Sequence, residues 1–323
     1  MNTSAIILLG LALTACTKQQ DRIKMEILES TVIDSEISTE ESTDKNEHPT
    51  EALEHFNPLP YAGEIETLAS GFWFVEGPLS RDNGTLLFSD IPANKIYQLD
   101  NNGLSIFRNN SYHSNGLFES PNGELFIAEH GNRRIAKMTA EGSQAVVEEF
   151  EGNRLNSPND LVFHSNGDLF FTDPPYGIEE HQREQHQNHV FRYTSEGELS
   201  SIWSGPIDSR PNGIALSLDE KTLFVSDTNE AVIRSFTLDE NGVPSEGNIF
   251  AYVSSVADGM TVDPFGNLYV ATVAGIEVIG TTGELWGTIQ LPNQPSNCTF
   301  GGENSSTLYI TAVDSVFSLT FDW

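Results

Sequence analysis

The 323-residue chain has little cysteine, few basic side chains and no apolar run long enough to cross a bilayer. Its two cysteines, Cys16 and Cys298, are too few for a disulfide framework or a zinc ribbon. Only 16 Lys and Arg residues stand against 47 Asp and Glu residues, which gives a formal net charge of −31. Such an acidic surface repels phosphate backbones and anionic bilayers, which excludes nucleic-acid binding as the main function. Apolar residues make up 38% of the chain, enough to build a core.

The N-terminus resembles a bacterial lipoprotein signal. Residues 5–13 form an apolar run that has the length of a signal-peptide core. It leads into Leu13-Thr14-Ala15-Cys16, which is similar to a lipobox, although no Lys or Arg precedes the run. We expect residues 1–16 to be a lipoprotein signal peptide, Cys16 to carry the lipid, and the protein to be anchored to the cell envelope on the periplasmic or outer-membrane side. The alternative is an ordinary secretory signal with a chance cysteine. If Cys16 is the anchor, Cys298 is left without a cysteine partner and would be a buried apolar residue or a free thiol.

Residues 17–60 differ in composition from the rest of the chain. The stretch 26–54 is rich in Glu, Ser, Thr and Asp, poor in aromatic residues and without sustained periodicity. Such a segment cannot bury enough apolar surface to offset its ordering entropy. We therefore expect a disordered acidic linker between the anchor and a domain at residues 61–323, with membrane contact only through the lipid.

Six internal repeats fill this domain. In each, a polar residue is followed by a small residue, an apolar strand, a turn and a second apolar strand. The polar residues are Glu76, Asn115, Asn159, Asn212, Asp258 and Asn297, separated by 39, 44, 53, 46 and 39 residues. Repeats of about 45 residues with several short strands are typical of β-propeller blades, whereas a β-sandwich would not explain the period. We predict an all-β, six-bladed β-propeller in which strands near 64–68 and 315–321 share a blade and close the ring.

The repeats also predict a site. The innermost strands of a propeller surround a central channel, so the six polar residues would lie together on one face. All six carry a side-chain oxygen, and turn chemistry alone does not account for Glu76 before Gly77-Pro78. Carboxylate and amide oxygens without thiol or imidazole favour a hard cation. We expect one divalent metal ion, for which Ca²⁺ suits the donors best and Mg²⁺, Mn²⁺ and Zn²⁺ are alternatives.

Several segments resemble the gluconolactonase branch of the SMP-30 (regucalcin)/gluconolactonase family. They are residues 74–78, 129–135, 155–161, 171–177, 210–215 and 257–263. The resemblance implies a hydrolase of sugar lactones such as glucono-1,5-lactone, with Asp258 as the catalytic proton-transfer residue. It also implies a single catalytic metal, whose ligands would be Glu76, Asn159, Asn212 and Asp258.

Loops on the same face supply further candidates. Residues that could bind substrate are Asn115, Glu129, His130, Arg154 and Tyr176. A structural hydrogen bond is the alternative for His130, and a surface position is the alternative for Arg154. Asp90, Asp173 and Asp227 are interpreted as turn caps, and the long loop 174–189 as a partial lid.

Two other functions stay open on the sequence alone. The same metal site would suit hydrolysis of other esters or phosphotriesters. A tethered, non-enzymatic binding propeller is the third interpretation, although a scaffold would not need Glu76 and Asp258. We expect a monomer that acts on a small-molecule lactone.

Overall fold

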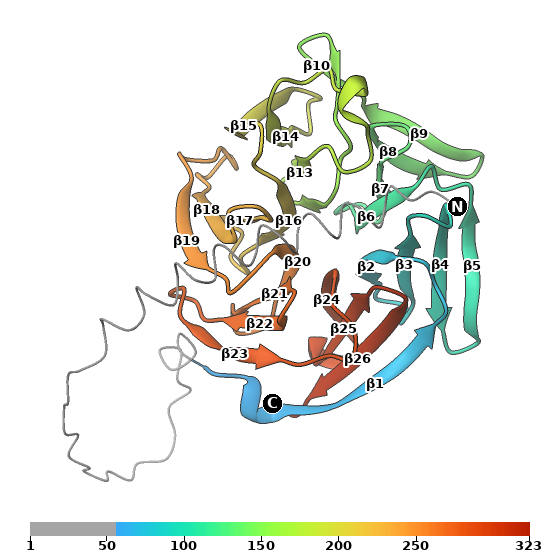
Figure 1. The fold of residues 1–323 in the computed structure, drawn as a ribbon, viewed down its shortest axis with the longest axis vertical. Coiled ribbons are helices and arrows are strands. Elements are labelled where there is room, and N and C mark those ends of the chain that lie inside the picture. The colour runs from blue at the N-terminus through green and yellow to red at the C-terminus, as the bar shows by residue number, and fades with distance from the viewer. Residues whose placement is uncertain (1–55) are drawn as a thin grey trace, which may run out of the picture. The chain divides into compact units, whose positions relative to one another are not determined.

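Residues 56–323, which the computed structural model describes, form six four-stranded antiparallel sheets arranged in a ring (Figure 1). The six-bladed β-propeller predicted from the repeats is therefore confirmed. The predicted signal peptide, Cys16 and most of the predicted linker lie outside the described residues. No helix within residues 56–323 is long and apolar enough to span a membrane.

Five blades are simple meanders whose first strand lies nearest the axis. Blade 1 has β2 (Val75–Ser80), β3 (Leu86–Asp90), β4 (Lys95–Asp100) and β5 (Gly103–Asn109). Blade 2 has β6 (Ser114–Glu119), β7 (Leu125–Glu129), β8 (Arg134–Thr139) and β9 (Gly142–Val147). Blade 3 has β12 (Leu161–Phe163), β13 (Leu169–Asp173), β14 (Asn188–Tyr193) and β15 (Leu199–Gly205). Blade 4 has β16 (Pro211–Leu216), β17 (Thr222–Asp227), β18 (Val232–Thr237) and β19 (Asn248–Tyr252). Blade 5 has β20 (Ala257–Val262), β21 (Leu268–Thr272), β22 (Gly275–Ile279) and β23 (Leu285–Ile289).

The sixth blade joins the two ends of the described chain. β24 (Asn297–Gly301), β25 (Thr307–Ala312) and β26 (Ser315–Phe321) pair in order, and β1 (Ala62–Ser70) adds the outermost strand. Ile65 pairs with Leu319, so the ring closes as the sequence predicts and β26 has no free edge. The Phe56 ring packs on Tyr61 and Phe265, so contacts with the propeller begin a few residues before the predicted boundary at residue 61.

A few short elements lie outside the six four-stranded sheets. They are the 3₁₀ turns η1 (Leu59–Tyr61), η2 (Glu180–Gln182) and η3 (Glu303–Ser305), and the two-residue strands β10 (Glu149–Phe150) and β11 (Asn153–Arg154). The hydrophobic core is divided among the blade interfaces. For example, Leu87 and Ile96 of blade 1 pack with Leu117 and Ile127 of blade 2. Burial between blades, rather than within one sheet, therefore holds the ring together.

The inner strands approach one another closely where the six polar residues lie. We call Glu76, Asn115, Asn159, Asn212, Asp258 and Asn297 the axial residues. A glycine follows the axial residue in four blades, and these glycines are Gly77, Gly116, Gly213 and Gly259. A Cβ atom on Gly77 would lie 2.1 Å from the Asn115 carbonyl oxygen, and one on Gly213 would lie 2.6 Å from that of Asp258. The pairing register is irregular at the same point of all four strands, as in β-bulges that redirect side chains.

We predict that Gly77→Ala destabilises the propeller far more than Gly84→Ala. Both glycines have positive φ angles, +54° and +81°, but a Cβ on Gly84 would meet no atom within 4 Å. Backbone strain alone should cost about 1 kcal/mol at Gly84, whereas the added clash at Gly77 should bring the loss to about 3 kcal/mol or more. Denaturant unfolding measures both values. Equal losses would show that close approach at Gly77 does not matter.

Candidate active site

The structure brings the six axial residues to one end of the central channel. Five are buried, and Asp258 is partly exposed. The Asn297 Nδ2 donates to Asp160 Oδ2 at 3.3 Å, although these residues belong to blades 6 and 3 on opposite sides of the ring. Side chains from opposite blades therefore meet across the axis, as the repeats predict.

Hydroxyl groups fix the backbone of three axial residues. A Ser or Thr near the end of the second strand of one blade donates to the axial carbonyl oxygen of the next blade. These bonds join Ser89 to Asn115 (2.8 Å), Thr172 to Asn212 (2.6 Å) and Ser226 to Asp258 (2.7 Å). Asp90 and Asp227, which follow two of these hydroxyls, accept backbone N–H groups of their own turns, as expected of turn caps. Asp173 instead accepts the N–H of the more distant Asn156.

Three carboxyl groups face one another around the axis. Burial raises the pKa of Glu76 well above its usual range, and the charges of Asp258 and Asp160 raise it further. Burial raises the pKa of Asp258 to about 7, which Asp160 increases although a hydrogen bond with Asn212 opposes the rise. Burial likewise raises the pKa of Asp160 to about 6. Since buried carboxylates are unfavourable without compensation, these groups favour bound protons or a cation.

Two axial amides present oxygens without a protein partner. Among the residues that the structure describes, the buried Oδ1 atoms of Asn115 and Asn212 accept no hydrogen bond. No group of three or more His, Cys, Asp or Glu side chains within residues 56–323 is placed to hold an ion, so a cation here would also need amide oxygens. Carboxylate and carbonyl oxygens are the ligands that Ca²⁺ and Mg²⁺ prefer. The side chains present therefore fit a hard divalent cation.

Two of the segments that carry the family resemblance, 155–161 and 171–177, interlock beside this centre. The Asn156 side chain donates to the Asp173 carbonyl oxygen at 3.0 Å, and its backbone N–H donates to Asp173 Oδ2 at 2.7 Å. The Ser157 hydroxyl donates to the Pro174 carbonyl oxygen at 2.7 Å and accepts the Gly177 N–H at 2.8 Å. Ser-Pro-Asn-Asp and Asp-Pro-Pro-Tyr-Gly thus form one unit, which positions both Asn159 and Tyr176.

The long loop of blade 3 reaches the axial residues through Tyr176. Its hydroxyl lies beside Thr228 and Asn212, and burial raises the pKa of this phenol. The loop is also tied to its surroundings, because Arg133 Nη1 donates to the Gln182 carbonyl oxygen at 2.9 Å. It is shorter than the predicted 174–189, since His189 belongs to β14, where it pairs with Asp173.

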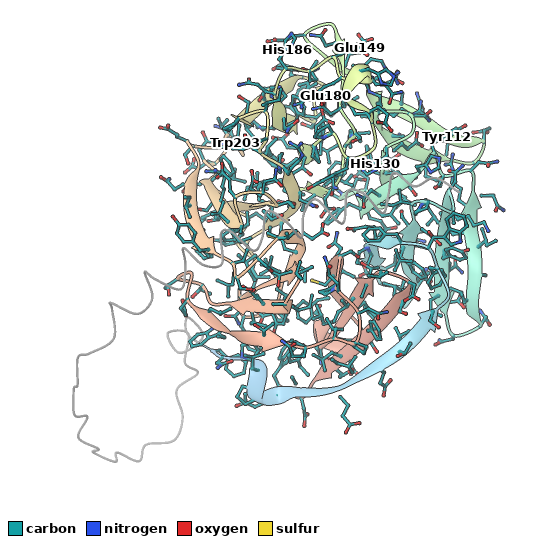
Figure 2. All side chains as sticks on the ribbon, viewed as in Figure 1. Tyr112, His130, Glu149, Glu180, His186 and Trp203 are labelled. Carbon is teal, nitrogen blue, oxygen red and sulfur yellow. The ribbon has the colours of Figure 1, made fainter. Side chains whose placement is uncertain are left out.

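His130 lies on the inner side of blade 2, closer to the centre of the ring than Tyr112 (Figure 2). Its Nε2 lies 3.4 Å from Asn115 Nδ2. Burial, assisted by His113, lowers the pKa of His130 to about 4, so the ring is neutral near pH 7. Asn115 and His130 are therefore placed together as an uncharged polar pair.

Two of the residues predicted to bind substrate, Glu129 and Arg154, have hydrogen-bond partners other than the axial residues. The Glu129 carboxylate is buried among its own neighbours, where it accepts from Ser143, Asn132 and Arg134. Arg154 is exposed, and its guanidinium donates to the Asn132 carbonyl oxygen at 2.8 Å. Glu129 and Arg154 thus make hydrogen bonds that hold the local structure together, and their positions do not support a role in substrate binding.

Two residues of the site were missed by the sequence reasoning. Asp160 stands at the position where four other repeats have glycine, and this substitution of Asp for Gly was the available signal. It also lines a cavity of about 300 Å³ that all six inner strands surround, together with the buried, free Cys298. The other residue is Thr228, whose hydroxyl contacts Asn212 at 3.0 Å. No sequence signal pointed to it, because the contact depends on the folded loop.

Comparisons with known proteins agree with this architecture. Residues 74–314 match the SMP-30/Gluconolactonase/LRE-like region. A gluconolactonase of Zymomonas mobilis is 38% identical over 292 residues, which cover 80% of this chain and 81% of that protein. Human regucalcin is 26% identical over 250 residues, which cover 71% of this chain and 79% of regucalcin. The solved structure of a gluconolactonase from Xanthomonas campestris has a TM-score of 0.74 and 31% identity, and the match covers 81% of this chain and 90% of that one. The chain therefore belongs to the SMP-30/gluconolactonase/LRE-like family.

Proposed function

We propose that this protein is a hydrolase that opens lactones, with sugar lactones of the glucono-1,5-lactone type as its substrate class. One observation carries this proposal. The carboxyl groups of Glu76 and Asp258 lie at one end of the channel together with amide oxygens that, among the described residues, accept no hydrogen bond. The 38% identity to a gluconolactonase supports the choice of lactones among the esters.

A divalent ion would be held by Glu76, Asn159, Asn212 and Asp258, and Ca²⁺ suits these oxygen donors. When bound, it would supply Lewis acidity to the lactone carbonyl. Within the chain, Glu76 and Asp258 provide the negative charge and the amides provide neutral oxygens. The Asn297 amide is engaged at both ends, by the Cys298 N–H and by Asp160, so it orients neighbours rather than serving as a ligand.

Asp258 would be the residue that moves the proton. It is the one axial residue that remains partly exposed, and a carboxylate oxygen that does not contact the ion could accept a proton from water. Its carboxylate would take a proton from the attacking water and return it to the ring oxygen as the lactone opens. The neutral His130, Asn115 and the Tyr176 hydroxyl would hold substrate hydroxyl groups.

Asp258→Asn should lower glucono-1,5-lactone turnover by about 10²–10⁴-fold, because the amide cannot accept the proton. The rate is followed by proton release in weakly buffered solution, with spontaneous hydrolysis subtracted. Asp82→Asn, an exposed change in the turn between β2 and β3, is the matched control and should keep the wild-type rate. Full activity of Asp258→Asn with metal bound would contradict the assignment.

Metal removal should make stability fall with rising pH. The folded-state pKa of Asp258 lies above its usual value, so its stabilising contribution is present at low pH and is lost as pH rises through about 7. A bound cation replaces the missing protons. The rise in Tm on adding Ca²⁺ to EDTA-treated protein should therefore be larger near pH 8 than near pH 5. An equal rise at both values would place the ion away from these carboxylates.

We also propose export and lipid attachment at Cys16, on the strength of the Leu13-Thr14-Ala15-Cys16 sequence. The full chain expressed in a bacterial host should mature to a protein that begins at a diacylglyceryl-modified Cys16 and sediments with the envelope. Cys16→Ser should lack the lipid mass. Mass spectrometry of a mature N-terminus without lipid on the wild-type chain would contradict this part.

A further inference from the structure

The Asn212 side chain has two chemically different ends, and only its oxygen can be a cation ligand. The Nδ2 group donates to Thr228 Oγ1 at 3.0 Å, and the same side chain also hydrogen-bonds the Asp258 carboxyl group. The Oδ1 atom is buried and, among residues 56–323, has no hydrogen-bond partner. Whatever fixes this orientation also decides whether Asn212 can hold an ion.

Thr228 can only accept from Asn212. A hydroxyl has a single proton, and that of Thr228 is donated to the Ala257 carbonyl oxygen at 2.7 Å. Its lone pairs therefore face the Asn212 amide, where an N–H group is favourable and an oxygen would be repelled. The Thr228 backbone is fixed as well, since its N–H donates to the Arg210 carbonyl oxygen at 2.9 Å.

Two of the other axial amides, Asn115 and Asn297, lack this arrangement. Asn115 faces Nε2 of His130, a ring nitrogen that donates or accepts according to its tautomer, so it does not impose one orientation. Asn297 is held at both ends, because its Oδ1 accepts the Cys298 N–H at 2.8 Å while its Nδ2 faces Asp160. Of these three amides, Asn212 is thus the one whose oxygen is both oriented and, among residues 56–323, left unpaired.

We propose that Thr228 is a positioning residue that directs the Asn212 oxygen toward the divalent ion. It also couples two adjacent blades, since its partners, the Asn212 side chain and the Ala257 carbonyl, stand on the inner strands of blades 4 and 5. This inference rests on the proposed metal site and adds to it a residue that does not itself touch the ion.

The test compares Thr228→Val, which keeps the shape but removes the hydroxyl, with Thr228→Ser, which keeps the hydroxyl. Calorimetric titration of the EDTA-treated proteins with Ca²⁺ gives the Kd, and Tm in EDTA reports folding. We expect Thr228→Val to weaken Ca²⁺ binding about 10–100-fold and Thr228→Ser to bind nearly as the wild type does. Ser306→Ala is the control, because it removes a hydroxyl–carbonyl bond (2.9 Å, to Glu303) in the loop between β24 and β25, away from the axial residues, and should leave the Kd unchanged.

An Asn212→Asp background distinguishes an effect of Thr228 on the orientation of the Asn212 amide from a general disruption of the site. Aspartate has oxygen at both positions, so Thr228→Val should have little further effect on the Kd there. Wild-type affinity in Thr228→Val, equal losses in the Val and Ser variants, or an undiminished loss in the Asn212→Asp background would overturn the proposal. Absence of Ca²⁺ binding to the wild-type protein would instead overturn the metal site, and this inference with it.

Discussion

The close approach of neighbouring inner strands is the constraint on which the site depends. Where Gly77 and Gly213 follow an axial residue, the carbonyl oxygen of the next blade occupies the space that a Cβ would need. Hydroxyl groups such as Ser89 and Ser226 then bind the same carbonyl oxygens and fix the spacing. Because this contact repeats around the ring, the axial side chains have one direction left, which is toward the axis.

Such convergence concentrates like charge in a small, buried volume. Burial raises the pKa of Glu76, Asp160 and Asp258, and repulsion from neighbouring carboxylates raises the pKa of Glu76 and Asp258 further. The apolar clusters between blades stabilise the fold and so offset the local loss of stability caused by these buried carboxyl groups. A cation at the axis would relieve the repulsion and use the Asn212 oxygen, so an arrangement that is unfavourable without a cation would suit the proposed metal site.

Much of this arrangement could be predicted from the repeats, because strand periodicity and turn residues are local properties of the sequence. The number of blades, the closing β1–β26 pair and the axial residues all followed from them. The repeats predicted that side chains converge on the axis but not which pairs meet there, so the contact of Asp160 with Asn297 between blades 3 and 6 was missed. Glu129 was predicted to bind substrate, yet it aligns in the repeat with Asp90 and Asp227 and, like them, is engaged in structural hydrogen bonds. The position of Glu129 in the aligned repeats therefore already indicated a structural role.

The most direct measurement is the position of the ion. Crystals of EDTA-treated protein grown with Mn²⁺ as an anomalous scatterer would locate it without reference to activity. The account predicts one strong anomalous peak at the axis, within coordination distance of oxygens from Glu76, Asn159, Asn212 and Asp258. A peak elsewhere with none at the axis, or an axial ion held without Asn212 and Asp258, would contradict it.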